Sequence, residues 1–223
     1  MTTATQRWTR EDLPAVQRIL LETWLDAYGP FIPRADITGY LNTHYSLPKL
    51  EALFADPDVT GLVAELDGAV AGYAKLYQAR AEQRFYMHQL YVLPSKQGFG
   101  LGRCLMACAE ECAREVAADR IWLGVMVKNT QAVAWYKKMG YTVTETAPFV
   151  MGSTTVDHYI GYLPLPLVKS SERGARGSEL GVAGGLVDQG PRKTSLPEGG
   201  REAIHASNPR NPRVMAGYQA SAK

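Results

Sequence analysis

The run from Pro94 to Arg103 has the composition of an anion-binding loop. It holds three glycines at alternate positions, between an expected strand over 85–93 and an expected helix over about 101–117. In a strand-to-helix turn, backbone N–H groups and the helix N-terminus can point together at a phosphate, and glycines let a diphosphate come close. The run matches neither Walker A nor the dinucleotide GxGxxG spacing. Glycine-rich turns also serve packing alone, so the loop indicates phosphate binding without naming the ligand.

The elements around this loop predict a mixed α/β (α+β) fold. Apolar periodicity and turn residues favour strands and helices in a mixed order. The expected strands are 3–8, 59–66, 69–78, 85–93, 121–127, 141–151 and 154–163, and the expected helices are 9–28, 35–44, 48–54, 101–117 and 130–139. A hairpin, a strand–helix–strand–helix unit and a second hairpin together predict a mixed sheet covered by helices.

A change of composition near Pro166 predicts one folded domain followed by a tail. Residues 1–167 are rich in apolar and aromatic residues and carry 15 Lys and Arg against 17 Asp and Glu. Residues 168–223 are rich in Gly, Ser and Pro and carry 9 Lys and Arg against 5 Asp and Glu. We therefore expect a slightly acidic domain over 1–167 and a disordered basic tail over 168–223. An acidic domain surface gives no support to nucleic-acid binding.

The sequence also predicts neither a membrane-spanning segment nor a metal centre. No stretch approaches the roughly 20 apolar residues of a membrane span, and the N-terminus has no leader pattern, so we expect a cytoplasmic protein. Cys104, Cys108 and Cys112 recur every fourth residue without histidines nearby. Small thiols packed beneath a sheet explain that spacing better than a metal or redox site, and no metal is expected.

Two separated motifs resemble the GNAT N-acetyltransferase superfamily. The first joins Leu90–Pro94 to Gln97–Gly102, which is similar to the coenzyme A signature Arg/Gln-x-x-Gly-x-Gly/Ala. The second joins Asn129 to the segment AWYKKMGY at 134–141, which is similar to Asn…Ala-x-x-Tyr-x-x-x-Gly-Phe/Tyr. The resemblance runs from about residue 9 to 165. It implies the GNAT fold, with about seven mostly antiparallel strands, four or so helices and two central parallel strands that splay apart.

Within that superfamily the chain resembles the PaiA-like polyamine acetyltransferases. The residues that carry this likeness are 122–125, 135–141 and 149–152 with Asp157. It implies transfer of an acetyl group from acetyl-CoA to a primary amine such as spermidine. Relatives of this branch often have acidic residues on the strand that here reads Tyr86-Met87-His88-Gln89-Leu90, and this chain has none there.

The superfamily resemblance assigns the cofactor contacts residue by residue. The pyrophosphate would lie against the backbone of Gln97, Gly98, Phe99, Gly100, Leu101 and Gly102, and the pantetheine arm along Leu90, Tyr91 and Val92. The side chain of Asn129 would hydrogen-bond the cofactor near the splayed strands. Asn129 could equally cap the helix that follows it, and the two roles are compatible.

Tyr136 and His88 are the candidate catalytic residues. In many GNAT enzymes a tyrosine at the position of Tyr136 protonates the leaving thiolate, whereas a purely structural role would leave it a packed aromatic. By period two Tyr86, His88 and Leu90 share one strand face, which would let His88 accept a proton from the amine. A structural or exposed histidine is the alternative. Four carboxylates could bind a cationic acceptor or be ordinary surface groups: Asp26, Asp36, Glu82 and Asp157.

Three functions fit the sequence. The first is acetylation of a small amine, with polyamines ahead of amino-sugar, antibiotic or amino-acid amines. The second is acetylation of a protein or peptide amine. The third is a module that binds acyl-CoA without turnover. GNAT domains are often dimers, so a homodimer is left open.

Overall fold

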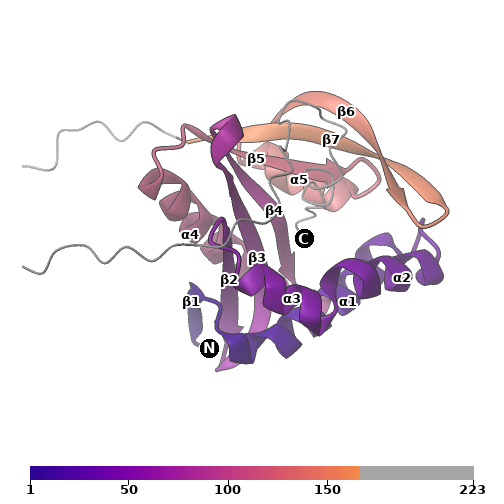
Figure 1. Ribbon diagram of the computed structural model, residues 1–223, viewed down its shortest axis with the longest axis horizontal. Coiled ribbons are helices and arrows are strands. Elements are labelled where there is room, and N and C mark those ends of the chain that lie inside the picture. Colours follow the sequence, from indigo (N-terminus) through magenta and orange to yellow (C-terminus); the bar gives the residue numbers. More distant parts are fainter. Residues whose placement is uncertain (166–223) are drawn as a thin grey trace, which may run out of the picture. The chain divides into compact units, whose positions relative to one another are not determined.

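Seven strands form one sheet in the order β1-β2-β3-β4-β5-β7-β6 in the computed structural model, which describes residues 1–165 (Figure 1). The strands are β1 (Thr3–Arg7), β2 (Val59–Leu66), β3 (Ala69–Ala79), β4 (Arg84–Val92), β5 (Arg120–Met126), β6 (Thr142–Met151) and β7 (Thr154–Pro164). This mixed sheet, with the helices around it, confirms the predicted α/β fold class. The tail predicted for 168–223 lies outside the described residues.

The helices lie over two faces of the sheet. Short 3-10 turns η1 (Arg10–Asp12), η2 (Arg80–Glu82) and η3 (Pro94–Lys96) accompany the helices α1 (Leu13–Tyr28), α2 (Arg34–Tyr45), α3 (Leu47–Phe54), α4 (Leu101–Glu115) and α5 (Thr130–Lys138). Tyr73 of β3 stacks on Trp8 on the side of α1 to α3. Its neighbour Gly72 faces α4, because a Cβ there would lie 3.1 Å from Leu105. Alternate residues of β3 thus meet different helical layers.

β4 and β5 are the parallel neighbours in this sheet, and they separate soon after they meet. Their register joins one pair of residues, Tyr86 and Trp122, near the start of each strand. The other neighbouring strands pair antiparallel over five or more positions. Beyond Tyr86, β4 and β5 have no further registered pair, so a parallel ladder does not continue between them. The splayed central strands expected from the GNAT resemblance are therefore present.

A β-bulge in β4 corrects the predicted strand face. The register with β3 passes from Leu76 opposite Met87 to Lys75 opposite Gln89, so His88 has no residue opposite it. Because an extra residue reverses the alternation, Tyr86 and Leu90 end on opposite faces. The prediction that Tyr86, His88 and Leu90 share a face was wrong for Leu90, since period two assumes an unbroken ladder. Tyr86 and His88 remain on one side, with ring centres 5.4 Å apart.

Candidate active site

A cleft of about 390 Å³ surrounds the glycine loop, and we call it the glycine cleft. Val92, where β4 ends, and the first turn of α4 form part of its wall. Gly98 and Gly100 adopt φ angles of +83° and +84°, which residues with a Cβ rarely adopt. Gln97 ties the loop back to the strand, because its Nε2 donates to the carbonyl oxygen of Val92 at 3.3 Å. The glycine pattern thus produces a tight, backbone-lined turn.

The glycine cleft offers donors suited to an anion. In the described chain, the N–H groups of Gly98, Phe99 and Gly100 have no backbone acceptor. The first N–H groups of α4 point out of the helix, where the helix dipole favours negative charge. Lys96 and Arg103 add two cations to the lining, and neither enters an ion pair within residues 1–165. This is the chemistry of a phosphate cradle.

The glycine cleft includes only part of the predicted cofactor set. Six of its lining residues were predicted: Val92, Gln97, Gly98, Gly100, Leu101 and Gly102. Four predicted residues do not line it: Leu90, Tyr91, Phe99 and Asn129. The cleft also has four residues that the sequence reasoning missed: Lys96, Arg103, Gln131 and Trp135. The two cations flank the glycines in sequence and could have been found there, whereas Gln131 and Trp135 come from α5, which only the fold brings near.

Several buried polar atoms beside the splayed strands have no hydrogen-bond partner. They are Nδ2 of Asn129, the hydroxyl of Tyr136 and both amide atoms of Gln89. The Oδ1 of Asn129 accepts the N–H of Ala132 at 3.1 Å, so this residue does cap α5 while its Nδ2 stays available. Four further buried atoms without a partner lie on Trp24, Tyr73 and His158, so unpaired polar atoms are not confined to this region. Buried polar groups are normally satisfied, and a ligand near Asn129, Tyr136 and Gln89 would satisfy theirs.

Tyr136 lies on α5 with its side chain fully buried between Trp135 and Tyr141, at ring distances of 5.0 and 5.9 Å. Burial raises the pKa of its hydroxyl well above 10, and the neighbouring Tyr91 and Tyr141 act in the same direction. The hydroxyl therefore keeps its proton throughout the neutral range. The influence of Tyr91 also places Tyr136 near β4 at the strand separation.

A second cleft, of about 490 Å³, lies between α2–α3 and the strands β3–β4, and we call it the lysine cleft. Its lining is His44, Tyr45, Lys49, Ala52, Leu53, Asp56, Val59, Lys75, Tyr77 and His88. His88 stacks on the ring of Tyr77 at 5.2 Å and lies 5.4 Å from that of Tyr86. His88 thus reaches the cleft on the same side of β4 as Tyr86, near the residue pair that joins β4 to β5.

Burial lowers the pKa of His88 well below 6.5, and the positive charge of Lys75 lowers it further. The imidazole is therefore neutral near pH 7 and can accept a proton. Its low pKa makes it a weak base. Lys75 also lines this cleft and was not among the predicted site residues, because its alternating strand gave no sign of which face its side chain would take.

The four carboxylates considered for a cationic acceptor, Asp26, Asp36, Glu82 and Asp157, line neither cleft. Asp36 instead accepts hydrogen bonds from Ser153 and Thr154, the shortest at 2.7 Å, and fixes α2 to the β6–β7 turn. Glu82 accepts the hydroxyl of Tyr86 at 2.8 Å. Asp36 and Glu82 thus have structural partners.

Three further findings concern the described residues alone. No group of three or more His, Cys, Asp and Glu side chains among them is arranged to hold a metal ion. Cys104, Cys108 and Cys112 are free, half-buried thiols, two of which pack against the core. None of the described helices combines the length and apolar character that crossing a membrane requires.

Comparison with known proteins identifies the family to which this fold belongs. Residues 15–141 match the model of the Acetyltransferase (GNAT) family, more than half of the 223 residues, and the chain belongs to this family. It is accordingly an N-acetyltransferase of the GNAT type.

Three similar proteins illustrate the range. An uncharacterised N-acetyltransferase of Mycobacterium bovis is 28% identical over 149 residues, 67% of this chain and 95% of its own. The L-methionine sulfoximine/L-methionine sulfone acetyltransferase of Salmonella typhimurium is 34% identical over 92 residues, 40% of this chain and 54% of its own. The crystal structure of the PaiA N-acetyltransferase of Thermoplasma acidophilum in complex with coenzyme A aligns at a TM-score of 0.61, with 21% identity, over 71% of this chain and 99% of that one. Other acetyltransferases align as well, so the comparisons do not single out the polyamine branch.

Proposed function

We propose that this protein transfers an acetyl group from acetyl-CoA to a small primary amine. The observation that carries the proposal is the group of unpaired buried atoms of Gln89, Asn129 and Tyr136 beside the separated strands, next to a loop built for a diphosphate. PaiA of Thermoplasma acidophilum, which has the same fold, is described in complex with coenzyme A. A diphosphate on the glycine loop and amides beside open strand edges fit that ligand.

The glycine cleft would hold the diphosphate through the N–H groups of the loop, with Lys96 and Arg103 balancing its charge. The open edge of β4 at Tyr91 and Val92 would pair with the amides of the pantetheine arm, as a neighbouring strand would. The Nδ2 of Asn129 would donate a further hydrogen bond. Bound acetyl-CoA supplies an activated thioester, and the residues below supply the proton transfers.

Two side chains move protons in the proposed reaction. His88 takes one proton from the acceptor amine, directly or through a water, while the amine nitrogen gains the acetyl group. Tyr136 gives its proton to the sulfur that leaves, and its raised pKa keeps that proton available at any neutral pH. One proton leaves nitrogen and one reaches sulfur, and proton exchange with solvent then returns the imidazolium of His88 and the phenolate of Tyr136 to their starting states.

The similar proteins do not agree on an acceptor. The Salmonella typhimurium protein is named for methionine sulfoximine and methionine sulfone, whereas the Thermoplasma acidophilum protein with the same fold is a PaiA N-acetyltransferase. A polyamine acceptor, the expectation from the PaiA resemblance, would need carboxylates near the site. The two described clefts contain one, Asp56.

Thiol release from acetyl-CoA, followed with a panel of polyamines, amino acids, amino sugars and a lysine peptide, tests the proposal. Amine-dependent thiol release together with mass-spectrometric detection of the N-acetyl product is the expected result. Tight acetyl-CoA binding with no release for any amine would contradict it and favour a module that binds without turnover. Release with the peptide alone would move the function to protein acetylation.

A further inference from the structure

Lys75 is a buried cation with no anionic partner. Only 4% of the residue is exposed, and none of the ion pairs found in residues 1–165 includes it. Its Nζ lies 5.1 Å from the centre of the Tyr45 ring and 3.4 Å from the Tyr45 hydroxyl. A hydroxyl contact at that distance and a ring face compensate a buried charge only in part. Proteins rarely bury an ammonium without a carboxylate unless the site is used.

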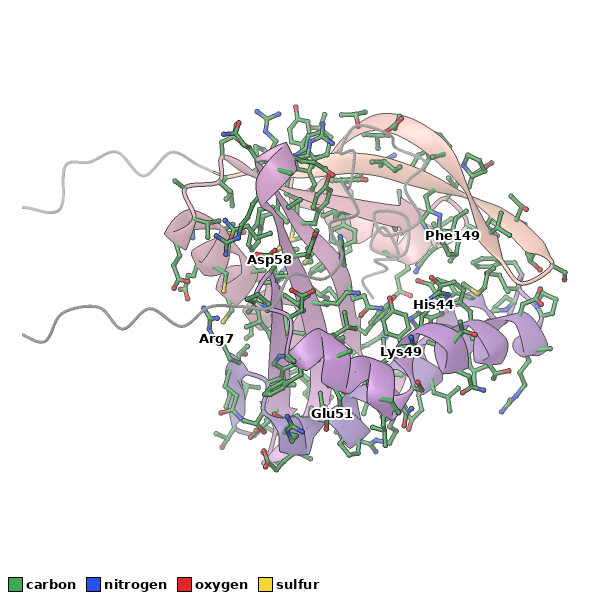
Figure 2. All side chains as sticks on the ribbon, viewed as in Figure 1. Arg7, His44, Lys49, Glu51, Asp58 and Phe149 are labelled. Carbon is green, nitrogen blue, oxygen red and sulfur yellow. The ribbon has the colours of Figure 1, made fainter. Side chains whose placement is uncertain are left out.

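The other charged groups of the lysine cleft leave a positive excess. Lys49 and His44 lie close together where α2 meets α3 (Figure 2), and burial, Lys49 and Lys75 all lower the pKa of His44. The lining carboxylate is Asp56, whose Oδ1 accepts the N–H of Asp58 at 2.9 Å. Because their lowered pKa values keep His44 and His88 largely uncharged near pH 7, the charged groups that remain are two lysines and one carboxylate.

The state of Lys75 near neutral pH fits an anion-binding role. Burial lowers its pKa from 10.5 to about 8, so it is still mostly ammonium at pH 7. An anion that enters the cleft would attract the Lys75 ammonium and so compensate the loss of hydration that burial causes. A polyamine would instead bring further ammonium groups beside Lys75 and Lys49, and like charges at short range repel.

We propose that the lysine cleft binds the acceptor through an anionic group held by Lys75, so that the substrate is a small amine that also carries a carboxylate, as an α-amino acid does. The assignment deepens the proposed acetyl transfer and rests on it. The cleft volume of about 490 Å³ suits a small molecule. His88, on the same wall and next to the strand separation, places a proton acceptor between the anchored carboxylate and the reacting centre.

Matched pairs of acceptors test this selectivity. Thiol release is measured with the standard α-amino acids, with the carboxamides of those that react, and with spermidine. Each pair differs by one negative charge. Because a charge-assisted hydrogen bond is stronger than a neutral one, the carboxylate should have a kcat/KM roughly tenfold or more above its carboxamide. A preference for carboxamides or for spermidine would overturn the assignment.

Variants of Lys75 connect the preference to this side chain. Lys75→Met keeps the length and removes the charge, and it should bring the carboxylate-to-carboxamide ratio to within about threefold of one, whereas Lys75→Arg should keep part of the preference. Lys137→Met, an exposed lysine of α5, is the matched control and should leave the ratio unchanged. A Lys75→Met enzyme with the full preference would assign the anion to another group.

A binding measurement separates the two proposals. Amino acids at millimolar concentration should raise the thermal midpoint of the wild-type protein and not that of Lys75→Met, whether or not turnover occurs. If amines that lack a carboxylate are acetylated as well as those that carry one, the acetyl transfer is supported and the proposed role of Lys75 is contradicted. Carboxylate-dependent stabilisation without turnover would retain the role of Lys75 and remove acetyl transfer. Equal shifts in wild type and variant would contradict the role of Lys75.

Discussion

The glycine cleft and the lysine cleft are built in different ways. The glycine cleft is mainly backbone, from the consecutive residues that join β4 to α4, and its cations are Lys96 at the surface and Arg103. The lysine cleft is made of side chains from α2, α3, β2, β3 and β4 together with the α3–β2 turn, and its central cation is buried. The glycine cleft would therefore bind a ligand through its backbone conformation, and the lysine cleft through charged side chains.

This difference matches what each cleft would hold. A diphosphate presents the same oxygens in every turnover, and backbone N–H groups in a fixed turn suit it. An acceptor differs from one GNAT enzyme to another, and side chains at a helix–sheet junction can change without disturbing the loop. We therefore expect changes in the lysine cleft to alter selectivity and changes in the glycine cleft to alter cofactor affinity.

The largest effect should follow from removing the buried hydroxyl of Tyr136. Tyr136→Phe keeps the packed ring and loses the proposed acid, so kcat should fall about a hundredfold, as for other general acids. Affinity for acetyl-CoA, measured by titration calorimetry, should change little. Because the hydroxyl is buried without a partner, the variant should also be at least as stable as the wild type. Full turnover with intact cofactor affinity would remove Tyr136 from the mechanism.

The second effect concerns stability at the buried lysine. Because the pKa of Lys75 is about 8 in the folded protein and 10.5 in the unfolded chain, the unfolded chain binds more protons over that interval. The free energy of unfolding should then rise by about 3 kcal/mol between pH 8 and 10.5. Below pH 8 the buried ammonium of Lys75 should destabilise the folded protein by that full amount. Lys75→Met should remove both, as urea titrations at pH 7 and pH 10.5 would show. A less stable variant at pH 7 would mean that the charge has an unseen partner.

The same contrast explains what could be predicted from sequence. The strand–loop–helix around Gly98 and Gly100 is local, so spacing was enough to predict a glycine turn between a strand and a helix. The alternation of elements was enough to predict the mixed sheet. The predicted family was confirmed. Tyr136 and Asn129 remain predictions as catalytic and cofactor-binding residues, although both lie buried with unpaired atoms.

The lysine cleft could not be predicted, because its residues are far apart along the chain. Lys75 and His88 come together only through the pairing of β3 with β4, in which Lys75 lies opposite Gln89 and His88 is the bulged residue next to it. Strand pairing depends on tertiary packing, and a period-two pattern does not give its register. The carboxylates proposed for a cationic acceptor illustrate the same point, since Asp36 is used at a helix–hairpin contact 117 residues away in sequence.

The third prediction concerns the imidazole of the lysine cleft. His88 has a pKa well below 6.5, so it is neutral at pH 7 and gains a proton only in acid. The value of kcat should therefore fall as the pH drops through that low pKa. His88→Gln should lower kcat about tenfold, a modest factor because the base is weak, and should remove this acidic limb. His44→Gln, a partly exposed histidine of the same cleft, should retain the limb, and an unchanged profile in His88→Gln would exclude the base.

A smaller effect should come from the backbone of the glycine cleft. Gly100 has φ +84° and open space where a Cβ would lie, so Gly100→Ala acts through conformation and not through a clash within the protein. Left-handed backbone costs a residue with a Cβ about 1–2 kcal/mol, which should raise the KM for acetyl-CoA roughly fivefold with kcat nearly unchanged. Gly39→Ala in α2 also meets nothing within 4 Å and should leave this KM unaltered. A loss of kcat in Gly100→Ala would show that the loop does more than bind.

The smallest effect should follow from repeating the lysine-to-methionine change in the glycine cleft. Lys96 is exposed, so its attraction to a phosphate is screened by water and worth at most about 1 kcal/mol. Lys96→Met should raise the KM for acetyl-CoA about threefold at low ionic strength, and the difference should shrink as salt is added. Stability should not change, in contrast to Lys75→Met. Steady-state kinetics at two salt concentrations measures the effect, and a salt-independent loss would mean that Lys96 contacts the cofactor in a water-excluded position.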